Sequence, residues 1–382
     1  MKVVIAPDSF KESLTARQVA ENLRDGLAAV WPDAEYVLVP MADGGEGTVQ
    51  SLVDATGGRR MTVPVSDPLG RPVEASFGVL GGGDVAVLEM AAASGLELLE
   101  PGERDPLGAS TYGTGQLITA ALHTGTRRII VGIGGSATND GGAGMVQALG
   151  GRLVDASGAD LSPGGAALAE LAHIDLSGLP ERLRAVEIVV ACDVDNPLTG
   201  PRGASRVFGR QKGADPQMIE QLDAALGTLA RVIRADLGVD IEDVPGAGAA
   251  GGLGGGLLAF LGADLQRGID IVIEHTALVD AVAGADLVIT GEGALDSQTR
   301  YGKTPAGVAR VAKERGVPVV AVAGSVGDDA GALLGDVFDA IVPIVPGPCE
   351  LADALAAGPA NLRRAGEQIG RLLRLGGAPV GR

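Results

Sequence analysis

The sequence predicts an α/β protein in which a flavodoxin-like, doubly wound parallel sheet is interrupted by an inserted α+β domain. Apolar strand patterns alternate with amphipathic helix patterns at both ends of the chain, and closely spaced turns break this alternation near residue 66. At 382 residues the chain is also long enough for two domains. We therefore expect one domain from residues 1–65 and 285–382, and an inserted domain from residues 66–284.

The first elements favour the doubly wound sheet. Residues 2–6 form a continuous apolar run of the type found in buried parallel strands, and a second strand is expected at 36–40. Between them, Thr15 and Gln18 have the spacing of a capping box and precede an apolar stripe at helical spacing. This strand–helix–strand order is typical of the start of such a sheet.

The middle of the chain has shorter elements, and the ending returns to the opening pattern. An antiparallel meander is expected from three strand-like runs at 61–66, 72–79 and 85–90. Further strands are expected at 128–133 and 187–192, and helices at 114–123 and 217–237. The final strands are expected at 286–290, 318–323 and 340–345, with helices at 305–315 and 361–375. Five strands then build the first sheet.

Charge and composition exclude several function classes. A formal net charge of -18 argues against nucleic acid or an acidic membrane surface as a partner, because both would be repelled. Only two cysteines occur, so no disulfide framework or cysteine-rich metal site is expected. No apolar run reaches the ~18–20 residues that a membrane-spanning helix needs. We expect a cytoplasmic enzyme that acts on a small molecule, and the sequence predicts no oligomeric state.

Candidate site residues follow the expected strands, because ligands of doubly wound sheets bind beyond the carboxyl ends of the strands. An isolated acid at such a position usually caps a helix, but here several loops combine acids with Gly, Ser or Thr. These residues are Asp8, Asp43 and Glu46, Glu292 and Asp296, Ser325, the segment Ser136–Asp140, and Asp193, Asp195 and Asn196.

Lysine is rare and occurs in polar loops. Only five of the 30 basic residues are lysine, and Lys11, Lys212 and Lys303 lie in segments rich in Gly, Ser, Thr or Gln. A compact ammonium is a frequent phosphate ligand. Lys303 directly precedes Thr304 and Pro305, which suit an N-cap and first helical position, so an anion site is expected there. The helix expected near Asp140, after Gly134–Thr138, is a second candidate.

One motif favours a different function. Residues 246–251, Gly-Ala-Gly-Ala-Ala-Gly, match the dinucleotide fingerprint, and Glu274 follows at about the right distance. No convincing strand precedes the motif, because Pro245 interrupts the approach. Tight helix packing explains the glycines equally well. A nucleotide-binding oxidoreductase is therefore kept as an alternative.

Taken in order, the polar loops resemble those of the bacterial glycerate kinase family. The resemblance runs from residue 1 to about 375, and two departures flank lysines: Glu12 stands where the family usually has Gly, and Arg210 where Pro is common. The matching stretches are 7–11 (PDSFK), 42–48 (ADGGEGT), 110–115 (STYGTG), 132–142 (GIGGSATNDGG), 193–198 (DVDNPL), 211–214 (QKGA), 245–252 (PGAGAAGG) and 291–299 (GEGALDSQT).

The resemblance implies transfer of a phosphate from ATP, with Mg²⁺, to glycerate, in a cleft between two domains. The product is expected to be 2-phosphoglycerate, with 3-phosphoglycerate as the alternative. Candidate catalytic residues are Asp193, Asp296, Lys11 and Lys212. Candidate ATP-binding residues are Gly134, Gly135, Ser136, Thr138, Asn139, Lys303 and Thr304. Candidate glycerate-binding residues are Asp8, Ser9, Asp43, Glu46 and Asn196, and candidate metal ligands are Asp193, Asp195 and Glu292. The choice of base among the carboxylates stays open.

Overall fold

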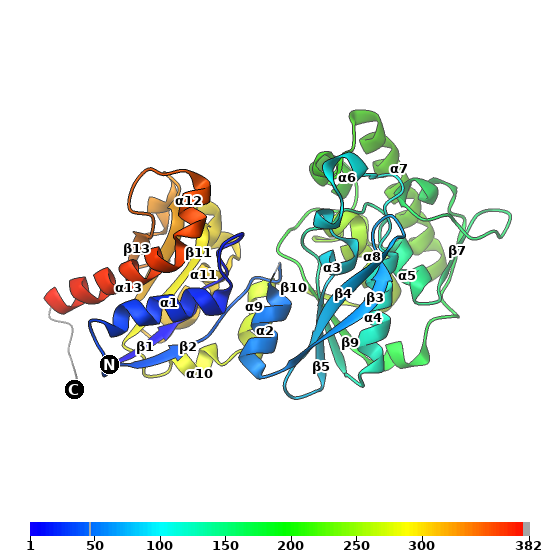
Figure 1. The fold of residues 1–382 in the computed structure, drawn as a ribbon. Coiled ribbons are helices and arrows are strands. Elements are labelled where there is room, and N and C mark those ends of the chain that lie inside the picture. The colour runs from blue at the N-terminus through cyan, green and yellow to red at the C-terminus, as the bar shows by residue number, and fades with distance from the viewer. Residues whose placement is uncertain (46, 377–382) are drawn as a thin grey trace. The chain divides into compact units, whose positions relative to one another are not determined.

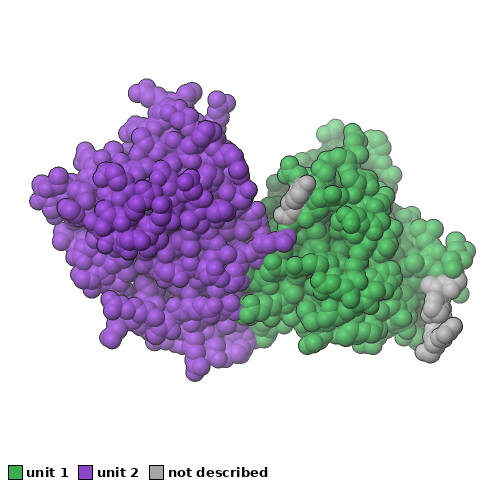
Figure 2. Space-filling model, turned by 180° about the vertical axis from the view of Figure 1, so that it is seen from behind, with its two compact units in different colours: residues 1–43, 54–56, 269–382 green, residues 44–53, 57–268 purple. Residues whose placement is uncertain are grey.

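The protein is a mixed α/β chain, and the computed structural model describes residues 1–45 and 47–376 (Figure 1). Its contacts divide it into two compact units, coloured separately in Figure 2. The first unit contains residues 1–43, 54–56 and 269–382, and the second contains residues 44–53 and 57–268. Within the described residues, no helix is both long and apolar enough to cross a membrane.

The first unit is built on a five-stranded sheet in which every neighbouring pair is parallel, in the order β13-β12-β11-β1-β2. Its strands are β1 (Lys2–Ile5), β2 (Glu35–Leu38), β11 (Leu287–Leu295), β12 (Val319–Val326) and β13 (Ala340–Pro343). Its helices are α1 (Ala16–Ala28), α9 (Gly268–His275, of which Gly268 belongs to the second unit), α10 (Leu278–Val282), α11 (Thr304–Lys313), α12 (Leu351–Ala356) and α13 (Gly358–Leu375).

Helices α1 and α13 lie side by side against this sheet (Figure 1). Leu23 of α1 and Leu362 of α13 are fully buried and share a core with Val3 of β1 and Ile289 of β11. The capping box expected at Thr15 and Gln18 is present at the start of α1. Burial of each such apolar side chain stabilises the fold by ~1.5–3 kcal/mol, so this core holds the two helices against the sheet.

The second unit contains a six-stranded mixed sheet in the order β10-β9-β6-β5-β4-β3, and a small two-stranded sheet. Its strands are β3 (Arg59–Ser66), β4 (Pro72–Val79), β5 (Val85–Glu89), β6 (Arg128–Gly132), β7 (Arg152–Val154), β8 (His173–Asp175), β9 (Glu187–Ala191) and β10 (Asp264–Gln266). Its helices are α2 (Thr48–Thr56, whose last three residues belong to the first unit), α3 (Ala91–Ser94), α4 (Tyr112–His123), α5 (Ala143–Ala148), α6 (Ala204–Phe208), α7 (Pro216–Leu237) and α8 (Leu253–Leu261).

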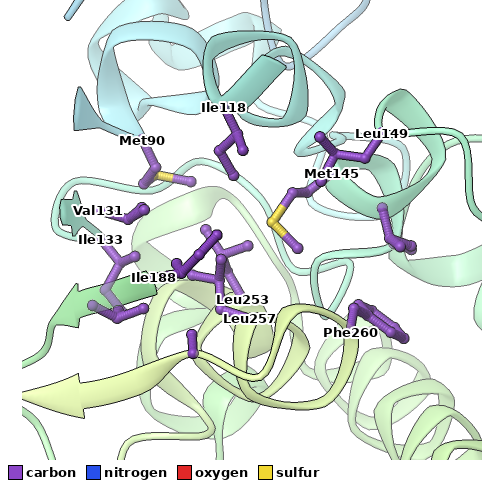
Figure 3. Packing of buried hydrophobic residues seen from close by; sticks show 14 of the residues in the cluster. Met90, Ile118, Val131, Ile133, Met145, Leu149, Ile188, Leu253, Leu257 and Phe260 are labelled. Atoms are coloured by element: carbon purple, nitrogen blue, oxygen red, sulfur yellow. The ribbon is translucent and has the colours of Figure 1, made fainter. Parts of the chain in front are cut away.

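The expected meander is present, since β3, β4 and β5 pair antiparallel, whereas β5, β6, β9 and β10 pair in parallel. Figure 3 shows that the core of this unit is built mainly from aliphatic side chains and methionine. Aliphatic side chains such as Ile118 of α4, Val131 of β6 and Leu253 of α8 fill the core together with Met145. This core holds the parallel strands together, so that their carboxyl ends share one edge of the sheet.

Two boundaries differ from those expected. Residues 59–65 belong to the second unit, because β3 pairs along its whole length with β4. Residues 269–284 belong to the first unit, where Ile269 of α9 packs closely against Gly307 of α11. In addition, β11 continues to Leu295 and β12 to Val326, so Glu292 and Ser325 lie within strands and not in loops after them.

Candidate active site

Three carboxylates gather where β1, β2 and β11 approach the carboxyl edge of the first sheet. Asp8 follows β1, Asp43 follows β2, and Glu292 lies in the extended part of β11. The neighbouring order β11-β1-β2 places them together, and the backbone N–H of Asp8 donates to the carbonyl of Gly291 at 2.8 Å. Pairing of β11 with β12 at Glu292 and Ala323 holds Glu292 in place.

Asp8 is the most perturbed of these acids. It is only 9% exposed, and burial, followed by the charge of Asp43, raises its pKa to about 7. Hydrogen bonds oppose the shift: the Thr304 hydroxyl donates to Oδ2 at 2.5 Å, and the Ser9 backbone N–H donates to Oδ1 at 2.6 Å. Burial and the neighbouring acid thus raise the pKa of Asp8 toward the neutral range that suits a general base.

Lys303 supplies a positive charge beside these acids. Its Nζ lies 3.5 Å from Oε1 of Glu292 and 3.6 Å from Oδ1 of Asp296. Burial raises the pKa of Glu292, while Lys303 and the Thr299 hydroxyl lower it. Asp296 also accepts from the backbone N–H of Gln298 at 2.9 Å and so caps a short 3₁₀ turn.

The start of α11 differs by one residue from the expectation. Lys303 is the N-cap and Thr304 is the first helical residue. The Thr304 hydroxyl points to Asp8 and does not cap the helix. Pro305 fits the first turn, where its missing N–H costs nothing. The helix is ten residues long, so Lys303 stands at a positively polarised helix start.

The loop after β1 carries Lys11 and a strained neighbour. Lys11 is exposed, and Phe10 and Leu14 close the loop with reciprocal backbone hydrogen bonds. Glu12 has φ 60°, a left-handed conformation that residues with a Cβ adopt at a cost of ~1–2 kcal/mol. Gly would adopt this conformation without strain. The Glu at position 12, where the family usually has Gly, therefore adds local backbone strain.

In the second unit, the loop after β6 changes from exposed to buried along its length. Gly134 and Gly135 are exposed, whereas Ser136, Thr138 and Asn139 are buried. The Asn139 side-chain N–H donates to Ser205 Oγ at 3.0 Å. Direct ATP contact by Thr138 and Asn139 stays a prediction, but their burial favours support of the loop from inside the unit.

Lys212 lies beneath this loop and is almost completely buried, at 1% exposure. Its Nζ donates to Ser136 Oγ at 2.7 Å and to the Thr138 carbonyl at 2.6 Å. Burial lowers its pKa to about 7, and the charge of Asp140 opposes that shift. Direct contact of Lys212 with a phosphate or glycerate would require this segment to move.

Asp140 ends the candidate segment Ser136–Asp140, but the sequence alone predicts no particular role for it. It is fully buried and accepts from Thr111 N and Oγ1, at 2.8 and 2.9 Å, and from the backbone N–H groups of Gly142 and Gly144, both at 3.1 Å. Burial raises its pKa, and these hydrogen bonds lower it. The strand-end rule includes Asp140 in the candidate segment, but the sequence does not reveal its partner Thr111, which lies 29 residues away.

The loop after β9 has a mainly structural hydrogen-bond pattern. Asp193 accepts from the Gly268 backbone N–H at 3.1 Å. Asp195 is exposed and pairs with Arg202 at 2.9 Å, and the Asn196 side-chain N–H donates to the Arg202 carbonyl at 2.7 Å. The contacts with Arg202 fold the loop onto itself, and that of Asp193 joins it to the start of α9. The substrate and metal roles of the three residues stay predictions.

The candidate metal ligands are divided between the units, with Asp193 and Asp195 in the second and Glu292 in the first. Among the described residues, no three His, Cys, Asp or Glu side chains are grouped so that they could hold a metal ion by themselves. Glu46, a candidate for glycerate binding, lies outside the described residues.

The Gly246–Gly251 motif is explained by packing. Residues 249–252 form a kinked 3₁₀ turn instead of the start of a helix after a strand, and Glu274 lies in α9 instead of at a strand end. A Cβ on Gly251 would lie 2.0 Å from the Thr138 carbonyl oxygen, and one on Gly256 would lie 2.3 Å from that of Gly141. The geometry of a dinucleotide site is therefore missing from this segment.

Comparison with known proteins identifies the family. The model of the glycerate kinase family matches residues 3–374. The chain belongs to the glycerate kinase family. It is 56% identical over 375 residues to a glycerate kinase of Bacillus subtilis, covering 98% of each chain, and 52% identical over 376 residues to the glycerate 2-kinase of Escherichia coli, covering 98% and 99%.

A solved structure agrees with this membership. A crystal structure described as a candidate glycerate kinase 2 from Salmonella typhimurium LT2 superposes with a TM-score of 0.90 at 53% identity, covering 98% of this chain and 99% of that one. The resemblance noted from the polar loops is thus confirmed over the whole chain of this family member.

Proposed function

We propose that this protein is an ATP-dependent glycerate kinase that transfers the γ-phosphate of ATP to the 2-hydroxyl of glycerate. The observation that carries the proposal is the family match over residues 3–374, with relatives named glycerate kinase and glycerate 2-kinase at 52–56% identity. The polar loops that carried the resemblance also bring Asp8, Glu292 and Lys303 together near strand ends of the first unit, which supports a site for charged ligands.

The proposed architecture is a flavodoxin-like unit interrupted by an inserted α+β unit. Numbered within the first unit alone, its parallel sheet has the order 2-1-3-4-5, which is the flavodoxin-like order. Asp8 follows the strand at the point where this order reverses, and ligands of such sheets bind there. The mixed sheet of the second unit supports the α+β assignment.

Asp8 fits the role of general base better than Asp193 or Asp296. Its pKa of about 7 matches a neutral working pH, whereas Asp296 caps a turn and pairs with Lys303. In the proposed step, the Asp8 carboxylate takes the proton of the glycerate hydroxyl. The hydroxyl oxygen forms a bond to the γ-phosphorus, the bond from phosphorus to the bridging oxygen breaks, and ADP leaves.

The residues present fit ATP with Mg²⁺. Such Mg²⁺ takes only one or two protein carboxylates, while phosphates and water complete its shell. Glu292, with Asp43 nearby, offers carboxylate oxygens whose mutual repulsion a cation would relieve. Bound Mg²⁺ neutralises charge on the phosphates during transfer. Lys303 and the exposed Lys11 are proposed to orient the phosphates and the glycerate carboxylate.

A coupled assay of ADP release tests the function. With D-glycerate, ATP and Mg²⁺, the protein should release ADP at a rate that saturates with glycerate and is absent without it. Titration with NAD(H) should give no binding signal and no change in absorbance with glycerate. ADP release independent of glycerate, or tight NAD(H) binding, would contradict the kinase assignment.

A further inference from the structure

Lys212 is a buried cation without an obvious reason to be buried. It sits on the last residue of a short 3₁₀ turn, Arg210–Lys212, and its side chain is among the largest in the chain that are fully buried. Placing an ammonium inside a protein costs several kcal/mol unless it is paired and hydrogen-bonded. A methionine of similar length would fill the same space without that cost. The charge therefore calls for a functional explanation.

Both hydrogen bonds of the ammonium go to one loop. Nζ donates to Ser136 Oγ at 2.7 Å and to the Thr138 carbonyl at 2.6 Å, across 76 and 74 residues of sequence. Hydrogen bonds from a charged donor are about twice as strong as neutral ones. The two anchor points lie one and three residues after Gly135, which with Gly134 forms the exposed part of this loop. The ammonium thus fixes the buried half of the loop relative to its exposed half.

The surroundings show the same loop held from several sides. Asp140, whose charge acts on Lys212, is fixed by Thr111, Gly142 and Gly144. Gly251 approaches the Thr138 carbonyl from another side. Among the described side chains, Thr138 Oγ1 and Asn139 Oδ1 are buried without a hydrogen-bond partner. At Ser136 and Thr138, the side chain of Lys212 supplies polar contacts to the part of the loop that directly follows the exposed glycines.

We propose that Lys212 is a positioning residue: its ammonium holds Ser136 and the Thr138 carbonyl so that the exposed Gly134–Gly135 segment is fixed for binding the phosphates of the nucleotide. This proposal rests on the proposed function for the nature of the ligand. Lys212 acts through the loop and does not itself touch ATP. Neutralising or removing the ammonium should loosen the loop while the core of the second unit stays folded.

The test is a double-mutant cycle of Lys212→Met and Ser136→Ala, read by calorimetry with ADP and by hydrogen exchange of residues 134–142. Lys212→Met should weaken ADP binding and raise KM for ATP at least tenfold, with KM for glycerate changed less than twofold. Ser136→Ala should give a smaller loss, and the double variant should lose no more than Lys212→Met. Lys313→Met, a lysine of α11 outside the site, is the matched control and should bind ADP normally.

The pH dependence adds a readout that a purely structural role would not move. Because the ammonium is charged below a pKa of about 7, ADP affinity of the wild type should weaken as pH rises through that range. Lys212→Met should lack this dependence on pH. This wild-type measurement and Ser136→Ala remain informative even if Lys212→Met fails to fold.

Two outcomes overturn the proposal. Unchanged ADP affinity and unchanged loop exchange in folded Lys212→Met would show that the ammonium does not position the loop. Additive losses in the cycle would show that Lys212 does not act through Ser136. If the variants weaken ADP binding but the wild type shows no glycerate-dependent ADP release, the positioning role is supported and the proposed kinase function fails.

Discussion

Gly251→Ala probes the contact that presses the Gly246–Gly252 segment against the site loop. Gly251 has φ 68°, and a Cβ built on it would lie 2.0 Å from the Thr138 carbonyl oxygen and 2.6 Å from Asn139 Cα. Left-handed backbone costs an alanine ~1 kcal/mol net, and relieving the contact by moving backbone costs a further ~1–3 kcal/mol. The free energy of unfolding should therefore fall by ~2–4 kcal/mol.

Gly262→Ala is the matched control, since Gly262 has φ 62° but nothing within 4 Å of the built Cβ. Urea denaturation should give it a loss of only ~1 kcal/mol. Because the Thr138 carbonyl also accepts from Lys212, Gly251→Ala should raise KM for ATP in addition, whereas Gly262→Ala should not. Equal losses of stability in the two variants, or normal ATP kinetics for Gly251→Ala, would refute the packing argument.

Further variants test the first unit. In Asp8→Asn, kcat should fall at least a hundredfold. The pKa of Asp8 is higher in the folded than in the unfolded protein, so the wild type should lose stability as pH rises from about 4 to 7. Urea titrations at several pH values should show a flatter dependence of the free energy of unfolding on pH in the variant. Lys303→Met and Lys11→Met should each lower kcat/KM at least tenfold, ~1.4 kcal/mol of barrier, with Lys2→Met as a control of normal rate. Glu12→Gly should raise the free energy of unfolding by up to ~1 kcal/mol, because relief of strain exceeds the added chain entropy, whereas Glu12→Ala should not.

Much of the fold could be predicted because local patterns agreed with the final structure. The capping box at Thr15 and Gln18 does begin α1, and the helix expected at 217–237 is present as α7, Pro216–Leu237. The extension of β11 could not be predicted in this way. Gly291, Glu292 and Gly293 are poor strand residues, and only pairing with β12 makes them extended.

The site shows the same limit. The strand-end rule located Asp8, Asp43 and the loop after β6 because the carboxyl ends of parallel strands share an edge. It could not show that Lys212 is buried, since its partners lie 74 and 76 residues away in sequence. Nor could it distinguish Asp195 from Asp8. Asp195 is exposed and forms an ion pair with Arg202, whereas burial and a neighbouring acid raise the pKa of Asp8.

Phosphorus NMR of the reaction mixture tests the central claim most directly. With D-glycerate, ATP and Mg²⁺, we expect one 2-phosphoglycerate to form for each ADP, and the product should serve as a substrate for enolase. A 3-phosphoglycerate signal would leave the kinase assignment intact and contradict the proposed hydroxyl. Inorganic phosphate with unchanged glycerate, or no consumption of ATP, would contradict the glycerate kinase assignment itself.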